Sequence, residues 1–409
     1  MTRSAPRSRA RTGALSVLLS ILVVALLVPT ALLFAHTWRA EGDRAAATER
    51  EQDGVAYLRS LQQVAFAVAD AQSAAVSGRA VSREAIATAV QQADVTDAKL
   101  GATLRTTQRW SEIRSRLETL RDTPATADRT KALADYRELG DLVLALYGKV
   151  RDESGLVHDP DGDAFHLQNS AASQLPVAVI AAGRLTDVAA LAKAASTPAP
   201  GKQAPQATPQ QQAELVARLS AERVLLQQAS TQLVDDLRSA VDSTQSRTLG
   251  SNLLSRLDRF QRSADTLAAI FSQIGTGPAA PSGTGSDESI LGVARGELQA
   301  AAGELSTAIF NEVDRLLDTR LDEIDQTQLL AGGALAAAVL IAVGFFLAFF
   351  LGGRPRQARP SGPFPEGGPG APSADEPVSW PTVAPITGAP YQGAAQGNQT
   401  QWERSGAAR

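Results

Sequence analysis

The chain contains no cysteine and only three histidines among its 409 residues. Without cysteine it cannot build a disulfide framework, a thiolate nucleophile or a cysteine-based metal site. His36, His158 and His166 leave little material for a histidine metal centre or a Ser-His-Asp triad. The sequence also lacks a glycine-rich phosphate loop and a nucleophile elbow, so we expect neither enzymatic activity nor a bound cofactor.

The net charge is small, −4, from 39 Lys and Arg against 43 Asp and Glu. Proteins that bind nucleic acid usually carry a strongly basic patch or balance, so this composition gives no reason to expect nucleic acid as a partner. The basic residues that do cluster lie at residues 1–12 and shortly after residue 353. These two clusters are more simply explained as signals of membrane topology.

Two long apolar runs without charge, residues 14–35 and 329–353, enclose most of the chain. A helix needs about 20 residues to cross a hydrocarbon core of roughly 30 Å, so each run is long enough to span a membrane. We predict transmembrane helices at 13–36 and 329–353. The first run is longer than the apolar part of a signal peptide and is followed by no clean cleavage site, which favours an uncleaved anchor.

The flanking charges predict the orientation of these two spans. Loops rich in Arg stay in the cytoplasm, so residues 1–12 and 354–409 are expected inside the cell. Residues 37–328 hold more acidic than basic residues, as is typical of an exported segment. We therefore expect a two-pass protein of the plasma membrane with both termini cytoplasmic and its central domain extracytoplasmic.

The central region has the apolar spacing of helices, and the alternation typical of strands is absent. Apolar residues recur at steps of three and four in two stripes, one at residues 55–68 and one at residues 298–316. Proline and glycine are absent from residues 304–331, so the last helix is expected to continue into the second span. We predict an all-α fold in which the spans enclose an elongated extracytoplasmic assembly of one or two stacked four-helix-type bundles.

Helix boundaries follow from capping and helix-breaking residues. Ser82 is expected to cap a helix that runs on through Trp110 to Arg121. A break is expected between 243 and 250, and the Pro- and Gly-rich segments 197–209 and 275–286 read as linkers. The C-terminal segment 354–409 is rich in Pro and Gly and is expected to be disordered.

One segment of the central region has a distinctive sequence. Residues 156–167 read LVHDPDGDAFHL. They resemble the SGLxLDPDxDSYYL segment in the helical periplasmic sensor regions of bacterial two-span receptors. Such regions occur in methyl-accepting chemotaxis proteins, diguanylate cyclases and sensor kinases. Further similarities, in the same order as in those receptors, are Ser154-Gly155, Gln174-Leu175-Pro176, Gly183-Arg184-Leu185, residues 219–223 and residues 316–321.

The resemblance covers residues 110–351 and implies a helical sensor region that forms a homodimer by analogy with such receptors. The aromatic pair usual in those receptors is replaced here by Phe165 and His166. After residue 353 the sequence enters the Pro- and Gly-rich segment where such receptors continue into a HAMP linker and an output module. We therefore expect the signal to pass to a separate cytoplasmic signalling protein.

Three alternating aspartates, Asp159, Asp161 and Asp163, resemble the start of a calcium-binding loop. An EF-hand also needs glycine at its sixth position and glutamate at its twelfth. Those positions are Ala164 and Ser170 here, so we predict no metal site. We expect the aspartates to form a turn and cap the helix that follows.

The candidate ligand-binding residues are Trp110, Arg109, Phe165 and His166. An aromatic residue between helices can face a ligand pocket, but core packing is the favoured explanation for Trp110. Arg109 belongs to a basic segment that suits an anionic ligand, but a solvated, salt-bridged surface is the favoured explanation of that segment. The predicted function is a membrane-anchored sensor that binds a small ligand and displaces a helix. The alternative is a non-sensing scaffold of the cell envelope that uses its helices as a spacer and its tail to bind partners.

Overall fold

The computed structural model describes residues 9–122, 128–157, 162–196, 208–244, 246–274 and 286–352. Every regular element in these ranges is helical, so the all-α prediction is confirmed. The elements are α1 (Arg9–Val76), α2 (Arg83–Leu100), α3 (Thr107–Asp122), α4 (Arg129–Ser154), α5 (Gly162–Asn169), the π-helical η1 (Ser170–Gln174), α6 (Leu175–Ser196), α7 (Pro209–Ser243), α8 (Leu249–Ile274) and α9 (Ser286–Gly352). The predicted disordered tail and most of the two predicted linkers lie outside the described residues.

Several helix ends carry capping residues, of which the sequence analysis predicted Ser82. The Ser82 side chain accepts a hydrogen bond from the Ala85 amide at the start of α2. Thr208 and Gln211 form a capping box at the start of α7, with each side chain bonded to the other residue's backbone. α4 ends at Gly155, whose φ of 87° is the left-handed conformation that glycine adopts without a side-chain penalty.

One predicted helix is divided in the structure. The sequence predicts a helix from Ser82 through to Arg121, but α2 ends at Leu100 and α3 begins at Thr107. Asp97 explains the break, because its buried carboxylate accepts hydrogen bonds from Tyr57 Oη at 2.7 Å and Thr106 Oγ1 at 2.9 Å. The intervening turn brings the Thr106 hydroxyl to this carboxylate, so an unbroken helix would leave Asp97 with fewer partners.

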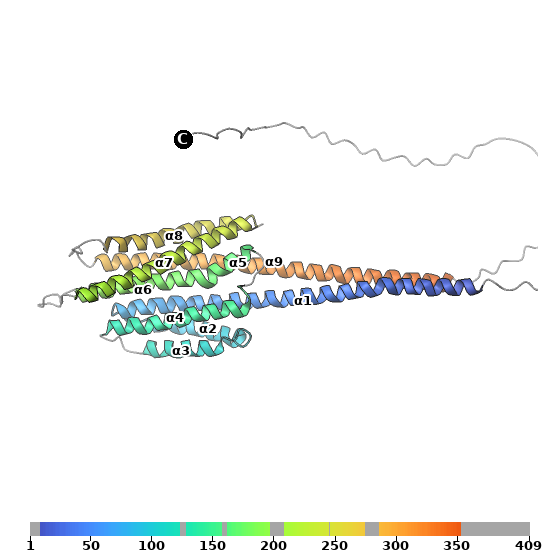
Figure 1. Cartoon of the computed structure of the whole chain (residues 1–409). Coiled ribbons are helices and arrows are strands. Elements are labelled where there is room, and N and C mark those ends of the chain that lie inside the picture. The colour runs from blue at the N-terminus through green and yellow to red at the C-terminus, as the bar shows by residue number, and fades with distance from the viewer. Residues whose placement is uncertain are drawn as a thin grey trace, which may run out of the picture. The chain divides into compact units, whose positions relative to one another are not determined.

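Two very long helices connect the ends of the described chain to its centre. α1 has 68 residues and α9 has 67. Each is therefore about 100 Å long, at 1.5 Å per residue. Arg59 Nη2 lies 2.7 Å from Asp314 Oδ2, and Arg295 Nη2 lies 2.9 Å from Asp70 Oδ1. These pairs place α1 and α9 side by side and antiparallel over the inner part of their length (Figure 1).

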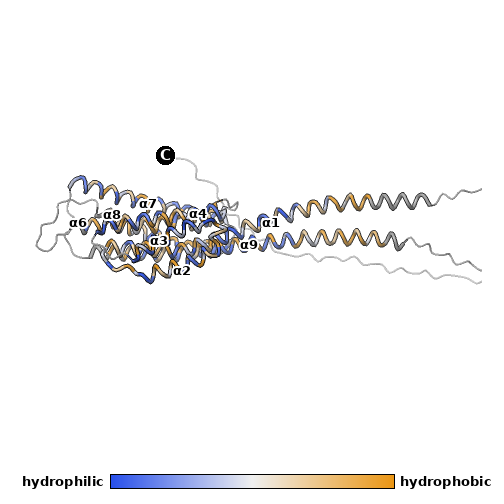
Figure 2. Tube along the Cα trace, turned by 90° about the horizontal axis from the view of Figure 1, so that it is seen from below, coloured by the Kyte–Doolittle hydropathy of each residue, from blue (hydrophilic) through white to orange (hydrophobic). Residues whose placement is uncertain are grey.

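The remaining helices pack alongside the inner halves of α1 and α9. α1 contacts α2, α4 and α6, while α7 contacts α5, α6 and α8. The helices lie side by side along their lengths (Figures 1 and 2). One continuous cluster of buried apolar residues joins them, and we call this packed region the helical core. The helices of the helical core therefore lie beside one another around one cluster of buried residues, whereas the sequence left one or two stacked bundles open.

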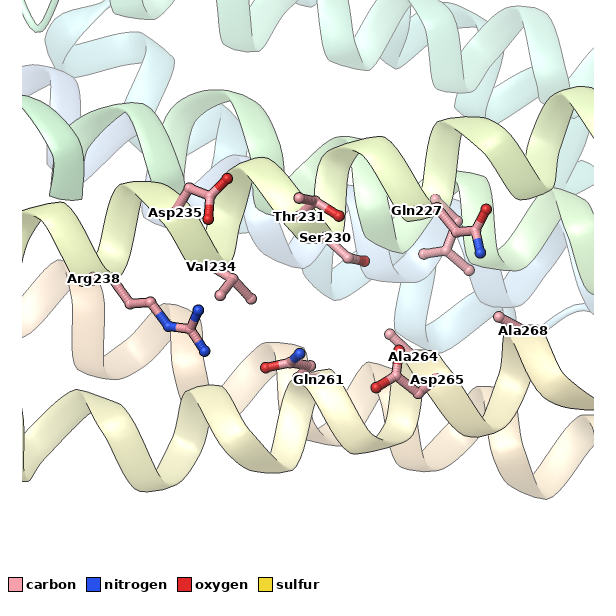
Figure 3. Close-up of a pocket in the computed structure, with 11 residues that line it drawn as sticks. Gln227, Ser230, Thr231, Val234, Asp235, Arg238, Gln261, Ala264, Asp265 and Ala268 are labelled. Carbon is pink, nitrogen blue, oxygen red and sulfur yellow. The ribbon is translucent and has the colours of Figure 1, made fainter. Parts of the chain in front are cut away.

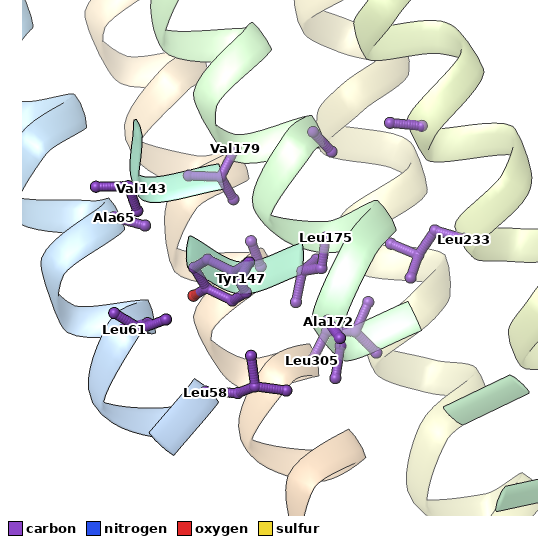
Figure 4. Close-up of a cluster of buried hydrophobic side chains, with 14 of the residues drawn as sticks. Leu58, Leu61, Ala65, Val143, Tyr147, Ala172, Leu175, Val179, Leu233 and Leu305 are labelled. Carbon is purple, nitrogen blue, oxygen red and sulfur yellow. The ribbon is translucent and has the colours of Figure 1, made fainter. Parts of the chain in front are cut away.

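The centre of the helical core is filled by leucine, valine and alanine around Tyr147. Leu58, Leu61 and Leu305 are each 0 % exposed. Figure 4 shows side chains from α1, α4, α6 and α9, with Leu233 of α7, gathered around this point. Close packing of this kind makes the large-to-small replacement of a core residue costly.

Among the described residues, three helical stretches are long and apolar enough to cross a membrane. They are Ile21–Val76, Gly162–Lys193 and Ile290–Leu347. The apolar window within Gly162–Lys193 is 78 % buried inside the protein, whereas the windows in the other two are 0 % buried. The uncovered windows of α1 and α9 form the hydrophobic stretches that extend beyond the helical core (Figure 2).

Candidate functional site

Trp110 and Arg109 lie on α3, where they face different surroundings. Trp110 is 3 % exposed, and its Nε1 donates a hydrogen bond to Asp94 Oδ1 at 2.8 Å. Arg109 is exposed, and its Nη1 donates to the Ala145 carbonyl at 3.3 Å. The indole of Trp110 therefore acts in core packing, and Arg109 lies at the surface between α3 and α4.

Phe165 and His166 lie on α5, which packs against α7. His166 Nδ1 is 3.0 Å from Asp236 Oδ1, and Asn169 Nδ2 donates to the other oxygen of Asp236 at 2.7 Å. The Phe165 and His166 rings meet edge to face, with centroids 5.4 Å apart. The four candidate residues thus fall into two pairs on helices with different packing partners.

The aspartate loop is described only at its end. Asp163 is the second residue of α5, and its carboxylate accepts a hydrogen bond from the Ala164 amide at 2.8 Å. Asp159 and Asp161 lie outside the described residues, so their capping role stays a prediction. Within the ranges that the structure describes, no group of three or more His, Asp or Glu residues is placed to hold a metal ion.

A buried charge cluster connects α4, α6 and α7. Arg184 of α6 donates to Asp141 Oδ1 at 2.6 Å and to the Arg137 carbonyl at 2.8 Å. Gly140 provides the space, because a Cβ there would lie 3.0 Å from the Arg184 guanidinium. Glu222 of α7 is 0 % exposed and forms an ion pair with Arg137 at 2.7 Å. Burial raises the pKa of Glu222, and the neighbouring Arg137 and Arg184 oppose that rise.

A second buried carboxyl, Asp187 of α6, lies near α1 and α9. Its side chain is 1 % exposed and accepts a hydrogen bond from Gln72 Nε2 at 2.7 Å. Burial raises the pKa of Asp187 to about 6, while the charges of Arg295 and Arg79 and the hydrogen bonds of Gln72 and Ser73 oppose the rise. Removing a carboxylate from water disfavours its charged form, which is why burial dominates here.

Among the described residues, a groove of about 450 Å³ lies between α7 and α8. This volume lies within the usual range for small-molecule sites, about 300–1,000 Å³. The groove is lined on α7 by Leu226, Gln227, Ser230, Thr231, Val234, Asp235 and Arg238, and on α8 by Gln261, Ala264, Asp265 and Ala268 (Figure 3). We call it the α7–α8 groove.

The floor of the α7–α8 groove is apolar and its rim is polar. Leu226, Val234 and Ala264 are almost fully buried and form the floor. The groove exists because small side chains, including Ala264 and Ala268, stand where the two helices face each other. Its polar rim includes amides, a hydroxyl and charges of both signs. This combination of apolar floor and convergent polar groups is typical of a ligand site.

One polar atom in the α7–α8 groove is buried without a partner. The Ser230 hydroxyl is shielded from solvent and has no hydrogen-bond partner within the described residues. Arg238 and Asp265 form no ion pair or hydrogen bond with any described residue, but both are exposed to solvent. A buried polar atom without a partner needs an explanation, and an absent water or ligand is one such explanation.

Neighbouring charges belong to a separate, shallower hollow between α8 and α9. It is lined by Arg259, Arg262, Ser263, Asp265, Thr266 and Glu297. Arg259 is already paired with Glu304 of α9 at 2.5 Å. Asp265 lines both hollows. The small side chains Ala264 and Ala268 line the α7–α8 groove and not the hollow between α8 and α9.

None of the α7–α8 groove residues is among the sequence candidates. The apolar stripes of the two helices are readable in the sequence, but the space between helices depends on how they face each other. One signal was available: Ser230, Thr231, Ala264 and Ala268 are small residues beside buried leucines. Small residues of this kind indicate a groove only once it is known that α7 and α8 pack against each other.

Comparison with known proteins finds no relatives for this chain. No family model, no curated protein and no solved structure matches it.

Proposed function

We propose that this protein is a membrane-anchored extracytoplasmic sensor. In this proposal the outer ends of α1 and α9 cross the plasma membrane, both termini are cytoplasmic, and the helical core is a bundle on the outer side. The resemblance of residues 156–167 to two-span receptors supports this function, as does the pair of long apolar helices. A small ligand binds in the α7–α8 groove.

The observation that carries the proposal is the continuity of α9. This helix runs without interruption from Ser286, in the helical core, to Gly352, at the end of its apolar stretch. Asn252 and Arg259 of α8 contact Glu312 and Glu304 of α9 at 2.7 Å and 2.5 Å. When a ligand moves α8 relative to α7, this movement is therefore passed on to α9 through the direct polar contacts between α8 and α9.

Transmission requires two arrangements that the ligand distinguishes. A ligand shifts an equilibrium only by the difference in its affinity for the two states. The α7–α8 contact can adopt two such arrangements because it contains the groove. By contrast, the ion pairs Arg59–Asp314 and Arg295–Asp70 join α1 to α9. Movement of α9 along α1 would have to break or exchange these pairs, which gives discrete states. The signal then passes to a separate cytoplasmic protein.

The absence of cysteine makes the topology directly testable. Thr208→Cys, at the start of α7, places one thiol in the helical core region. We expect a membrane-impermeant maleimide to label this variant in intact cells. A matched variant, Ser361→Cys in the C-terminal segment, is expected to react only after permeabilisation. The reverse labelling pattern would contradict the proposed orientation.

Disulfide cross-linking tests the signalling step. Gln52 Nε2 and Asp318 Oδ1 are 2.8 Å apart across α1 and α9, so cysteines at these positions report their relative movement. We expect a bound ligand to change the cross-linking rate of this pair. Cysteines at Arg116 and Glu138, which join α3 to α4 at 2.7 Å, form a control pair whose rate stays constant. A Gln52–Asp318 rate that no groove ligand alters would favour the scaffold alternative.

A further inference from the structure

We infer that Asp70 of α1 and Asp187 of α6 compete for Arg295 of α9, so that a proton on Asp187 decides whether Arg295 joins α9 to α1 or to α6. The inference goes beyond the proposed function, because it needs neither a ligand in the α7–α8 groove nor a particular orientation in the membrane. It follows from the position of one guanidinium close to both a surface carboxylate and a buried one.

Arg295 joins α9 to α1 in the structure. Its Nη2 donates to the Ala69 carbonyl at 2.7 Å and to Asp70 Oδ1 at 2.9 Å. Gln299, one turn later on α9, donates to the other oxygen of Asp70 at 3.1 Å. The Asp70 side chain is 61 % exposed, whereas that of Arg295 is 11 % exposed. Arg295 therefore reaches this surface carboxylate from a largely covered position.

Arg295 also lies against the face of α6 that carries Asp187. A Cβ at Gly183 of α6 would lie 4.0 Å from Arg295 Nε and 3.7 Å from Ala69 Cβ, so the missing side chain leaves room for the arginine. Gly183 and Asp187 are four residues apart and thus lie on the same face of the helix, about 6 Å from each other. The guanidinium that binds Asp70 is therefore about one helical turn from Asp187.

Asp187 is a buried carboxyl whose other neighbours come from α1. It is 1 % exposed and accepts a hydrogen bond from Gln72 Nε2 at 2.7 Å. Ser73 also bonds to it, and Arg79 acts on it through its charge. A carboxylate shielded from water is costly to ionise unless a cation compensates its charge. Arg295 is the cation that α9 provides.

The other helices that pack against α6 direct their charges elsewhere. The charged groups of α4 and α7 gather around Arg184, which lies three residues before Asp187. These groups are Arg137 and Asp141 of α4 and Glu222 of α7. Arg184 pairs with Asp141 at 2.6 Å, and Arg137 pairs with Glu222 at 2.7 Å.

Loss of the proton changes which contact Arg295 favours. Burial raises the pKa of Asp187 to about 6, and the charge of Arg295 is foremost among the interactions that oppose the rise. With the proton bound, Asp187 is neutral and Arg295 keeps Asp70 as its partner. When the proton leaves to the solvent, a poorly hydrated carboxylate faces the guanidinium. Its attraction exceeds that of the exposed Asp70, because solvent screens an exposed pair more strongly than a covered one.

Infrared titration of the full chain in maltoside detergent measures the protonation of Asp187, through the carboxylic-acid band that is lost in Asp187→Asn. Arg295→Gln removes a cation that favours the charged form, so we expect the midpoint of this band to rise by about one pH unit. Asp70→Asn leaves Arg295 to Asp187, so the midpoint should fall. In the double variant the midpoint should equal that of Arg295→Gln, because no shared cation remains.

The other ion pair between α1 and α9 provides matched controls. Arg59→Gln and Asp314→Asn break that pair and should leave the midpoint unchanged. Arg295→Lys keeps the positive charge and should keep the midpoint close to that of the unmodified protein. Circular dichroism checks that every variant retains its helicity. Because Asp70 is exposed, Asp70→Asn provides the test if Arg295→Gln does not fold.

Cross-linking measures the effect on α9. Cysteines at Arg59 and Asp314 join α1 to α9, and cysteines at Arg116 and Glu138 correct for the pH dependence of thiol chemistry. We expect the corrected rate with a bis-maleimide to fall about twofold between about pH 5 and about pH 7, on either side of the pKa of Asp187. A factor of this size corresponds to the loss of one partly exposed ion pair. In Asp187→Asn the corrected rate should not depend on pH.

Each measurement can overturn the inference. A midpoint that Arg295→Gln does not raise, or that Asp70→Asn does not lower, contradicts the competition. A shift by Asp70→Asn that persists in the double variant also contradicts it, since Asp70 would then act on Asp187 directly. A corrected cross-linking rate that ignores pH, or that still depends on pH in Asp187→Asn, shows that the proton on Asp187 does not control α9. None of these measurements uses a groove ligand, so their failure leaves the sensor proposal as it stands.

Discussion

The contact between α1 and α4 and the contact between α7 and α8 are built from different side chains. At the first, Gly54 lets α1 approach the end of α4 so closely that a Cβ there would lie 2.4 Å from Ser154 Cβ. Leu58 and Tyr147 are buried near this approach. At the second, small side chains such as Ala264 and Ala268 leave the α7–α8 groove open, and its charges are unpaired.

We expect the closely packed α1–α4 contact to be rigid and the more open α7–α8 contact to be the one that changes when a ligand binds. Closely packed helices resist displacement because any movement loses dispersion contacts. A contact that includes a groove loses less when it shifts, and a ligand can compensate that loss. The α1–α4 contact is therefore expected to hold the helical core together, and the α7–α8 contact to respond to a ligand. Four predictions test this comparison, in order of decreasing effect.

The largest effect is expected from removing a core leucine at the tight contact. Leu58 is 0 % exposed, so Leu58→Ala leaves a cavity and should lower the free energy of unfolding by about 3 kcal/mol. Leu254→Ala on α8, where the side chain is 41 % exposed, should cost less than about 1 kcal/mol. Denaturant unfolding followed by circular dichroism measures both. Equal losses would contradict the assignment of Leu58 to a closely packed contact.

The protonation of Asp187 should make stability depend on pH. Its pKa is about 6 in the folded protein against 3.8 as the ordinary value. The folded state thus binds the proton more tightly, and this stabilisation is complete below pH 3.8 and lost as pH rises through 6. Linkage gives a total loss of about 3 kcal/mol, an upper value for one group.

Asp187→Asn should remove this pH dependence because the amide keeps an acceptor for Gln72 and carries no charge. Asp258→Asn, at an exposed position on α8, serves as the matched control and should leave the slope unchanged. Thermal melts between pH 4 and pH 7 provide the measurement. A slope that persists in Asp187→Asn would assign the pH dependence to other groups.

Replacing glycine by alanine should have opposite effects on stability at a position where the helices pack closely and at one where a Cβ has free space. Gly54→Ala should cost about 2 kcal/mol, because the new Cβ clashes with Ser154. Gly148→Ala on α4, where a Cβ meets nothing within 4 Å, should stabilise the protein by up to about 1 kcal/mol through helix propensity. Melting temperatures of the two variants should therefore move in opposite directions. A stabilising Gly54→Ala would mean that α1 and α4 separate easily.

The smallest effects are expected from two serines. Ser60 Oγ donates to the Tyr57 carbonyl at 2.7 Å, so Ser60→Ala should cost about 1 kcal/mol. The Ser230 hydroxyl has no partner in the described part of the chain, so Ser230→Ala should be neutral or slightly stabilising in the absence of ligand. Chemical denaturation resolves the difference. A comparable loss in Ser230→Ala would indicate that water already satisfies this hydroxyl.

Local sequence signals were sufficient for the helical class and for several helix ends. The stripe that includes Leu58 and Leu61 predicted a buried face, and both residues are 0 % exposed. Ser82 caps α2 as expected, since capping depends on residues within one turn. The division between α2 and α3 was not predicted, because it depends on Asp97 meeting Tyr57, forty residues away in the chain.

The sequence by itself determined which segments are helical and where the charge-free apolar runs lie, because periodicity and capping act over a few residues. Only the tertiary structure decided that the apolar stretch within Gly162–Lys193 is covered by other helices, whereas those of α1 and α9 are not. It also decided that Trp110 packs in the core and that Arg238 and Asp265 share one groove. Burial and juxtaposition depend on which helices become neighbours, and no local pattern specifies that choice.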